Sequence, residues 1–301
     1  MITFLKFFFS TGLLLLLFRM VDFTAIGHLI ANATWMYIGW AMVFQWISTV
    51  LAAYRWSLIM ESLAFHEPFR FYVGSYFKGA FFNQALPGSI GGDAVRGLEL
   101  GAMGYRKKEA FFGIFLDRIV GLAGLLVLNL GANLLNGDLF PPWLFHLITM
   151  ICVGGIGGFG VLILLRKIAW LQKYRVTRVF ADLSHRFRQV YRTKKAIFIQ
   201  VTLSMIIHFF SILALYALAQ ALGVIFPLST FLVAVPPVFL LTIIPLSLAG
   251  WGVRESALVG IFLLLGASKE GISSVSVLYG LLLIGTSLPG LWIWVRGKKF
   301  V

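Results

Sequence analysis

A short segment with a proline, a serine and an arginine occurs twice in this chain. Residues 86–96 align without a gap on residues 244–254, and the same Pro, Ser, Gly, Val and Arg stand at five of the eleven positions. Both copies lie in apolar sequence, where an interrupted and charged segment is unusual. A duplicated segment of this kind at membrane depth is typical of the binding site of a transporter.

The composition of the chain points to a membrane. Of its 301 residues, 60% are hydrophobic and 12% are charged, whereas a soluble domain carries about 25% charged residues. Several apolar runs reach the roughly 20 residues that a helix needs to cross the hydrocarbon core. The single cysteine and the five scattered histidines show no ligand spacing, so we expect no metal site and no cofactor. The sequence predicts one polytopic membrane domain over residues 1–301.

The apolar runs predict an all-α integral membrane fold. We expect two broken, re-entrant hairpins at residues 71–103 and 229–266. About six transmembrane helices accompany them, near residues 3–20, 34–56, 109–135, 142–165, 196–222 and 273–295. Glycines at short helical spacing are expected to let helices pack closely; these are Gly121, Gly124, Gly154 and Gly158.

The positive charge of the chain, +14 in total, is concentrated in a few loops. Residues 166–195 hold ten Lys and Arg, whereas residues 136–141 and 223–228 hold none. Because basic loops stay in the cytoplasm, we expect both termini inside and a location in the cytoplasmic membrane. The two hairpins then enter from opposite sides, which predicts an inverted repeat of residues 34–135 and 196–295. Hairpins that cross fully twice give the same parity, so the sequence leaves both cases open.

Residues 166–195 also have an amphipathic pattern. Apolar residues recur at helical spacing, basic residues fill most other positions, and Asp182 is the only acid there. This pattern predicts an amphipathic cytoplasmic helix that lies on the inner leaflet. A basic loop that only fixes the topology is the alternative, and nucleic acid is not expected as a partner. The apolar positions are Val176, Val179, Phe180, Leu183, Phe187, Val190 and Tyr191.

Each copy of the repeat predicts a helix that stops and starts again. Pro87 and Pro245 cannot donate a backbone hydrogen bond and disfavour helix at the preceding residue, and new helices are expected near Asp93 and Val253. Free N–H groups and the dipole at such a helix start favour an anion, above all phosphate. The predicted turn residues are Pro87, Gly88, Gly91, Gly92, Pro245, Gly250 and Gly252, with Ser89 and Ser247 as polar groups of the loops.

Arg96 and Arg254, which end the two copies, are the main candidates for binding an anion. We expect both in the first turn of the new helices, where a guanidinium can grip two phosphate oxygens. Two facing copies would form a cationic pocket near the midplane. Asp93 and Glu255 are expected to hold the arginines while the site is empty, or to carry a proton if transport is proton-coupled. The alternative is that both arginines only reach for the interface.

Four further polar residues interrupt apolar sequence. Asp117 and Arg118 lie within the helix predicted at 109–135, and Lys78 and Asn83 lie on the entering arm of the first hairpin. Ionisable groups inside membrane segments indicate function by default. A structural alternative stays open for each: Asp117 and Arg118 as a pair that joins two elements, Lys78 as a group that reaches the interface, and Asn83 as a cap or a partner of a freed carbonyl.

The chain resembles the lysylphosphatidylglycerol synthase transmembrane region, also called the flippase-like integral membrane family of bacteria and archaea. The resemblance rests on three ordered motifs at residues 83–96, 117–122 and 244–255. It implies a domain that moves a lipid between leaflets. In multidomain relatives this domain is fused to an aminoacyl-tRNA-dependent domain, and since the chain ends at Val301, we expect no lysyltransferase activity. Stand-alone relatives are associated with hopanoids, phospholipids or polyprenyl-linked glycolipids, so the resemblance leaves the substrate open.

The expected function is therefore a lipid translocase without enzymatic activity. It would move an anionic phospholipid or a polyprenyl-phosphate-linked glycolipid between the leaflets of the inner membrane of a bacterium or archaeon. A carrier or channel for a small soluble anion and a membrane-embedded transferase acting on a polyprenyl-linked substrate remain as alternatives. Membrane lipids with an anionic head group are the expected partners, while a homo-oligomer and a partner enzyme of lipid or glycan modification stay open.

Overall fold

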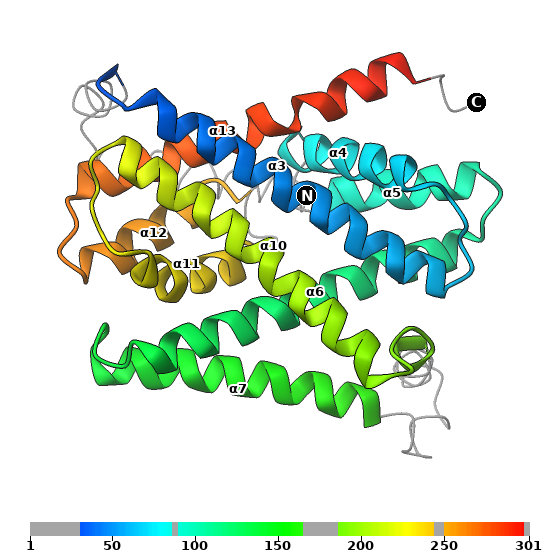
Figure 1. The fold of residues 1–301 in the computed structure, drawn as a ribbon, viewed down its shortest axis with the longest axis horizontal. Coiled ribbons are helices and arrows are strands. Elements are labelled where there is room, and N and C mark those ends of the chain that lie inside the picture. The colour runs from blue at the N-terminus through cyan, green and yellow to red at the C-terminus, as the bar shows by residue number, and fades with distance from the viewer. Residues whose placement is uncertain (1–30, 86–89, 165–185, 244–249, 298–301) are drawn as a thin grey trace, which may run out of the picture.

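The structure, a computed structural model, describes residues 31–85, 90–164, 186–243 and 250–297. These residues are helical with no strand among them (Figure 1). The first half contains α3 (Trp35–Ser62), α4 (Phe69–Ala85), α5 (Ile90–Ala102) and α6 (Lys107–Leu135), followed by α7 (Pro142–Leu164). The second half contains α10 (Lys194–Ala221), α11 (Leu228–Ile243), α12 (Val253–Leu263) and α13 (Lys269–Arg296).

Five of these helices, α3, α6, α7, α10 and α13, are long and apolar enough to cross a membrane. The all-α membrane fold is thereby confirmed. The helix predicted at 3–20 lies outside the described residues. The helix predicted at 34–56 continues to Ser62, because Arg55 finds its counter-charge inside the protein and does not end the helix.

Local signals explain where the long helices begin. Pro142 occupies the first position of α7, where its missing N–H costs nothing. The side chains of Thr193 and Ser268 cap α10 and α13 by accepting hydrogen bonds from Ala196 N (3.1 Å) and Gly271 N (3.2 Å). These caps precede the apolar runs, so both helices begin a few residues earlier than hydropathy predicts.

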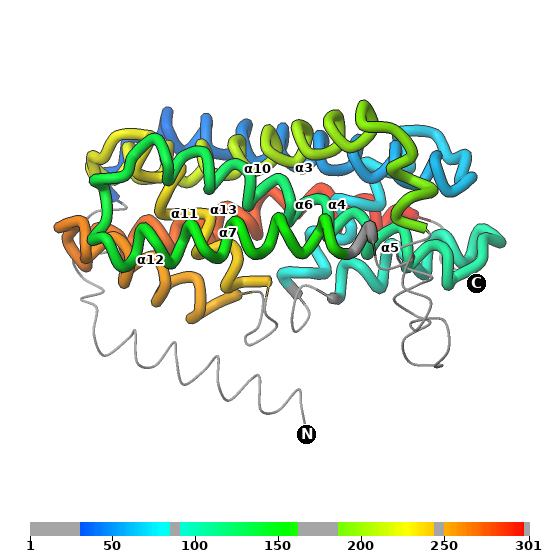
Figure 2. The backbone as a smooth tube through the Cα atoms, turned by 90° about the horizontal axis from the view of Figure 1, so that it is seen from below, coloured from blue at the N-terminus to red at the C-terminus, as the bar shows by residue number. Residues whose placement is uncertain are grey.

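Helices α3 and α10 run antiparallel and make the most extensive contact between helices in the described fold (Figure 1). Thr34 N donates to Ala221 O (3.0 Å), which joins the start of α3 to the end of α10. Midway, Ser48 Oγ donates to Ile207 O (3.0 Å). The hairpin of α4 and α5, which follows α3, and that of α11 and α12, which follows α10, therefore enter from opposite ends of the molecule. In Figure 2, α3 and α10 lie along one face, and α5 and α12 lie toward the other.

The two halves have matching helices. The lengths are 28, 17, 13 and 29 residues for α3 to α6 and 28, 16, 11 and 28 residues for α10 to α13. Their packing also corresponds: α4 lies against α13 as α11 lies against α6, and α5 lies against α6 as α12 lies against α13. Helix α7 packs on α6 and has no equivalent among the described helices of the second half.

The starts of α5 and α12 differ from each other. Helix α5 begins at Ile90 rather than near Asp93, so Gly91 and Gly92 lie inside its first turn and Arg96 lies in its second turn. This corrects the prediction that both glycines belong to the turn and that Arg96 lies in the first turn. In the second hairpin α12 begins at Val253, and Gly250 and Gly252 have φ of +80° and +84°, a backbone conformation that favours glycine. Residues 86–89 and 244–249, including Pro87, Gly88, Ser89, Pro245 and Ser247, lie outside the described residues.

The early start of α5 has a physical reason. Asn83 Oδ1 accepts a hydrogen bond from Gly92 N (2.8 Å), so α4 supplies the cap for the following helix. A Cβ on Gly92 would collide with the carbonyl group of Gly79. The two arms of the first hairpin thus touch backbone to backbone, and glycine is required at that point.

Glycine also serves helix packing elsewhere, with one correction. A Cβ on Gly124 would collide with Ser204 of α10, and one on Gly121 would lie 3.2 Å from the Arg55 guanidinium. By contrast, a Cβ on Gly154 or Gly158 would meet no atom within 4 Å. Among the described residues, no helix covers that face of α7, so the prediction that these two glycines bring helices together is not supported there.

The described end of the basic segment lies against the protein. Phe187, Val190 and Tyr191 are buried in a cluster with Ile59 and Leu116. Arg186 pairs with Glu109, and its guanidinium lies 5.0 Å from the centroid of the Phe112 ring. These three apolar residues therefore do not face the lipid surface as predicted, because α3 and α6 offer them a protein surface. Residues 166–185 lie outside the described residues.

The contact between Gly79 and Gly92 gives a stability prediction. Gly92→Ala should force α4 and α5 apart and cost about 1–3 kcal/mol by overpacking. The melting temperature of the detergent-purified protein should fall accordingly. Gly285→Ala on α13, where a Cβ meets nothing within 4 Å, is the matched control and should melt at or slightly above the wild-type temperature. Equal melting of both variants would contradict the close approach.

Candidate functional site

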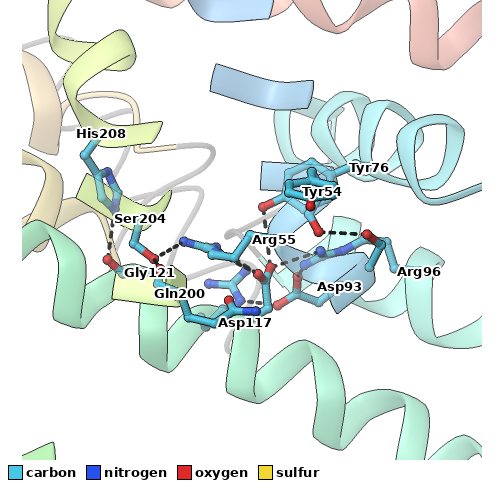
Figure 3. A network of polar contacts seen from close by, with 12 residues as sticks. Tyr54, Arg55, Tyr76, Asp93, Arg96, Asp117, Gly121, Gln200, Ser204 and His208 are labelled. Carbon is cyan, nitrogen blue, oxygen red and sulfur yellow. Dashed lines mark hydrogen bonds and ion pairs between the residues drawn. The ribbon is translucent and has the colours of Figure 1, made fainter. Parts of the chain in front are cut away.

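Five charged side chains, four of which are labelled in Figure 3, form a continuous string of alternating sign in the first half of the protein. Arg55 Nη2 lies 2.8 Å from Asp117 Oδ1, and Arg96 Nη1 lies 3.4 Å from Asp117 Oδ2. Arg96 Nη2 lies 2.6 Å from Asp93 Oδ1, and Arg118 Nε pairs with Asp93 Oδ2. Each aspartate thus holds two arginines. We call these five residues the charge string.

Side-chain accessibility rises along the charge string from Asp117 to Arg118. The side chains of Arg55 and Asp117 are 5% and 2% exposed, and Arg96 is 7% exposed. Asp93 is 14% exposed, and Arg118 is 34% exposed. A ligand that arrives from outside therefore meets Arg118 and Asp93 first.

Aromatic rings enclose the middle of the string. The Arg96 guanidinium carbon lies 4.8 Å from the Trp56 ring centroid and 4.6 Å from that of Tyr76. Both distances allow cation–π attraction, which is stronger away from water. The Tyr76 hydroxyl also donates to Asp117 Oδ2 (3.5 Å). Arg96 is thus held by two carboxylates and two rings at once.

Helix α10 holds the inner end of the string. Arg55 Nη1 donates to Ser204 Oγ (2.9 Å), and Ser204 Oγ donates to the Gln200 carbonyl (2.7 Å). His208 Nε2 lies 3.0 Å from Gly121 O (Figure 3). These contacts connect α3, α6 and α10 at the level of the charges.

The charge string borders a cavity of about 610 Å³. Much of its wall is apolar and comes largely from α6, with Phe115, Ile119, Leu122 and Leu125, together with Ile207 and Ile243. Its polar residues are Arg55, Tyr76, Asn83, Asp93, Arg96, Asp117, Arg118 and His208. Asn83 lies in the last turn of the entering arm of the first hairpin, and Ile243 ends that of the second, so both hairpins reach this cavity.

Arg254 lies in a separate cluster in the second half. Its Nη2 is 2.6 Å from Glu255 Oε1, and its guanidinium carbon lies 5.0 Å and 5.6 Å from the ring centroids of Trp251 and Tyr279. Glu255 Oε2 accepts from Gly252 N (2.6 Å), which caps α12. Neither Arg254 nor Glu255 lines the cavity that holds Arg96. The structure therefore places each arginine with its own acids and rings and does not join the two in this cavity.

Lys78 belongs to a third polar group. It pairs with Glu99, and Ser75 Oγ also donates to that carboxylate. Glu99 is buried, and the group joins α4 to α5. Asn83 acts as the cap described above and also lines the cavity.

Two charged residues were not expected from the sequence: Arg55 of the charge string and Glu99, the partner of Lys78. Both stand in apolar or glycine-rich helical sequence, and the rule that flags ionisable groups at membrane depth would have found them. The same rule also covers His208, since histidine is rare within membrane segments. Tyr76 carries no such signal, because an aromatic residue in a membrane helix is ordinary. Within the four described stretches, no group of three or more His, Cys, Asp or Glu side chains could hold a metal ion.

Comparison with known families places the chain in one of them. The family described as the lysylphosphatidylglycerol synthase TM region matches residues 3–290. The chain belongs to this family. A search of curated proteins finds no match. As a lysylphosphatidylglycerol synthase TM region, the protein is a multi-pass membrane domain of a family associated with lipid handling.

Asp117 offers a test of the charge string in this lysylphosphatidylglycerol synthase TM region. Asp117→Asn removes the carboxylate shared by Arg55 and Arg96 and should cost about 3–5 kcal/mol, as for a broken buried pair. The double variant Arg55→Met with Asp117→Leu should lose less, because it removes a charge of each sign. Asp138→Asn, at an exposed loop acid, should melt like the wild type. Melting of Asp117→Asn at the wild-type temperature would contradict the buried role of Asp117.

Proposed function

We propose that this protein moves a lipid with an anionic head group between the two leaflets of a membrane. The observation that carries the proposal is the cavity of about 610 Å³, which combines an apolar wall with the charge string. A lipid needs both surfaces, because its head group must keep charge compensation and its chains must stay out of water. In the proposed cycle no bond of the lipid is made or broken.

The depth of the charges suits this role. Asp117 lies about 15 Å from the start of α6 at 1.5 Å per residue, which is roughly half the thickness of a hydrocarbon core. A head group that reaches Arg118 and Asp93 would already have covered a large part of its path. Charges at such depth are expensive and are kept where a polar solute passes.

Matched halves support alternating access. The hairpins enter from opposite ends, and the helix pairs of one half correspond to those of the other. Inverted repeats of this kind give two related conformations, each open to one side. We propose that the two halves form such a repeat and that the lipid site alternates between the leaflets.

We further propose that the end of the molecule with Arg106, Lys107 and Lys108 faces the cytoplasm. Arg186 and Arg296 lie at the same end, since α6 starts and α13 finishes there (Figure 1). The opposite loops carry few basic residues. This asymmetry follows the rule that positive loops stay inside.

A carrier for a small soluble anion could use the same charges. The apolar residues of the cavity wall argue for a lipid, because a soluble anion gains nothing from Phe115, Leu122 or Ile243. An aqueous path would be expected to show a polar lining along its length.

Filling the cavity tests the proposal. Ala80 lines the cavity on α4, and Ala80→Trp should block the passage of a lipid whatever its head group. The measurement is the loss of fluorescent phospholipid from the outer leaflet of reconstituted vesicles, with quenching by an impermeant reductant. We expect the rate to fall to that of empty vesicles, while Ala102→Trp at the exposed end of α5 keeps the wild-type rate.

Two outcomes would overturn the function. One is wild-type flipping by a correctly folded Ala80→Trp variant. The other is uptake of phosphate or sulfate into vesicles by the wild type with no movement of any lipid.

A further inference from the structure

Helix α11 carries two consecutive prolines in its interior, Pro236 and Pro237. A proline has no N–H, so it leaves the carbonyl four residues earlier without its helical partner, and its ring crowds that carbonyl. The two carbonyls released in this way are those of Leu232 and Val233. In a membrane such groups need a partner from elsewhere in the protein.

That partner is the buried side chain of Asn129 on α6. Its Nδ2 donates to Val233 O (3.0 Å) and to Leu232 O (3.4 Å). Its Oδ1 accepts from Cys152 Sγ of α7 (3.5 Å), so both ends of the amide are used. One side chain therefore serves both released carbonyls, and it does so without restoring the hydrogen bonds within α11.

We infer that Pro236 and Pro237 form a joint in α11, about which the end of α11 at the cavity moves, and that Asn129 is the residue that positions this joint. The inference rests on the proposed function and concerns how the same cavity opens and closes. Bends in helices occur at prolines, and domain closure uses a few residues that absorb the change in backbone angles.

The packing of α11 changes at the joint. Before it, Phe231, Val233 and Val235 are fully buried. After it, Leu241 and Ile243 are 42% and 44% exposed. The first part of the helix is therefore fixed in the core, while its last turns are held less tightly.

The less tightly held end of α11 reaches the cavity, where Ile243 lines the wall together with Asp117 and Arg118. Along α6, Asn129 lies roughly 16 Å beyond Arg118, and along α11, Ile243 lies roughly 15 Å beyond Val233, at 1.5 Å per residue. Since α6 and α11 pack against each other, a bend at the joint displaces Ile243 beside the charge string without moving the buried first part of α11.

The entering arm of the first hairpin is built differently. Helix α4 contains no proline, and the carbonyl of Gly79 lies against Gly92 of α5. Lys78 and Asn83 also tie α4 to α5. The movement therefore belongs to the second hairpin, while the first keeps its part of the charge string in place.

The proline inside α13 does not form a second joint of this kind. Gly290, which follows Pro289, lies so close to α4 that a Cβ would collide with the carbonyl of Phe77. A bend at that point is clamped by the neighbouring helix, whereas α11 is free beyond its prolines.

Spin labels measure the movement directly. The labels are attached at Leu134→Cys on α6 and Leu241→Cys on α11, two exposed positions, after the single native cysteine has been replaced by Cys152→Ser, which can still donate to Asn129. Double electron–electron resonance is recorded in vesicles of phosphatidylethanolamine and phosphatidylglycerol. We expect two distances between these labels, one for each position of the end of α11.

The variant that removes the joint is Pro236→Ala with Pro237→Ala, which restores both N–H groups of α11. It should leave one distance between the two labels and slow the flipping of fluorescent phospholipid by at least about tenfold, because the opening of the cavity then limits the rate. Labels at Leu134→Cys and Ile225→Cys, which precedes α11, should give one distance with and without the prolines. Pro142→Ala, at the exposed start of α7, is the matched proline control and should flip lipid at the wild-type rate.

A double-mutant cycle tests the role of Asn129. Asn129→Leu should lower the melting temperature of the wild type, because two buried carbonyls lose their donor. In the variant with Pro236→Ala and Pro237→Ala the same carbonyls have helical partners again, so the fall should be less than half as large. An equal fall in both backgrounds would overturn the role of Asn129 at the joint.

The outcomes separate this inference from the proposed function. A single distance between the α6 and α11 labels in the presence of the prolines would overturn the joint alone, provided that the protein flips lipid. Wild-type flipping by the variant without the prolines would do the same. Two distances with the prolines and one without them, but no flipping of any lipid, would overturn the translocase and keep the joint. If the variant without the prolines fails to fold, the distances in the chain that keeps them decide.

Discussion

The shared carboxylate of Asp117 is the interaction on which the first half depends. One oxygen holds Arg55 of α3 and the other holds Arg96 of α5, while the backbone of Asp117 belongs to α6. Three helices are thereby joined by side chains that are at most 7% exposed. Removing any member leaves its neighbours uncompensated, so the site and the packing of α3, α5 and α6 form one unit.

Both halves hold a buried arginine with aromatic rings and an acid, but the rings and acids differ. In each, an arginine at the equivalent place of the repeated segment lies over two aromatic rings and pairs with a nearby acid. The first half extends this unit into the charge string beside the cavity, whereas the second half closes it with Glu255 and Ser276.

Much of the fold was predictable, because helices in a membrane must satisfy their own hydrogen bonds and must be long enough to cross. The start of α12 at Val253 followed from proline and glycine chemistry. The start of α5 did not, since the cap comes from Asn83 on another helix. The burial of Phe187 and Tyr191 was also missed, because an amphipathic pattern does not say whether its apolar face meets lipid or protein.

The sequence by itself determined the membrane fold, the duplicated interrupted segment and the family. It also pointed to most of the charged residues of the charge string, because hydropathy, proline and charge act locally along the chain. Only the tertiary structure decided which charges meet. It brought Arg55 to Asp117 across 62 positions of sequence, ordered five side chains into one alternating string and kept Arg254 apart from it. Ion pairing depends on distances between helices, and those distances are set by packing around the crossing of α3 and α10, which no local pattern records.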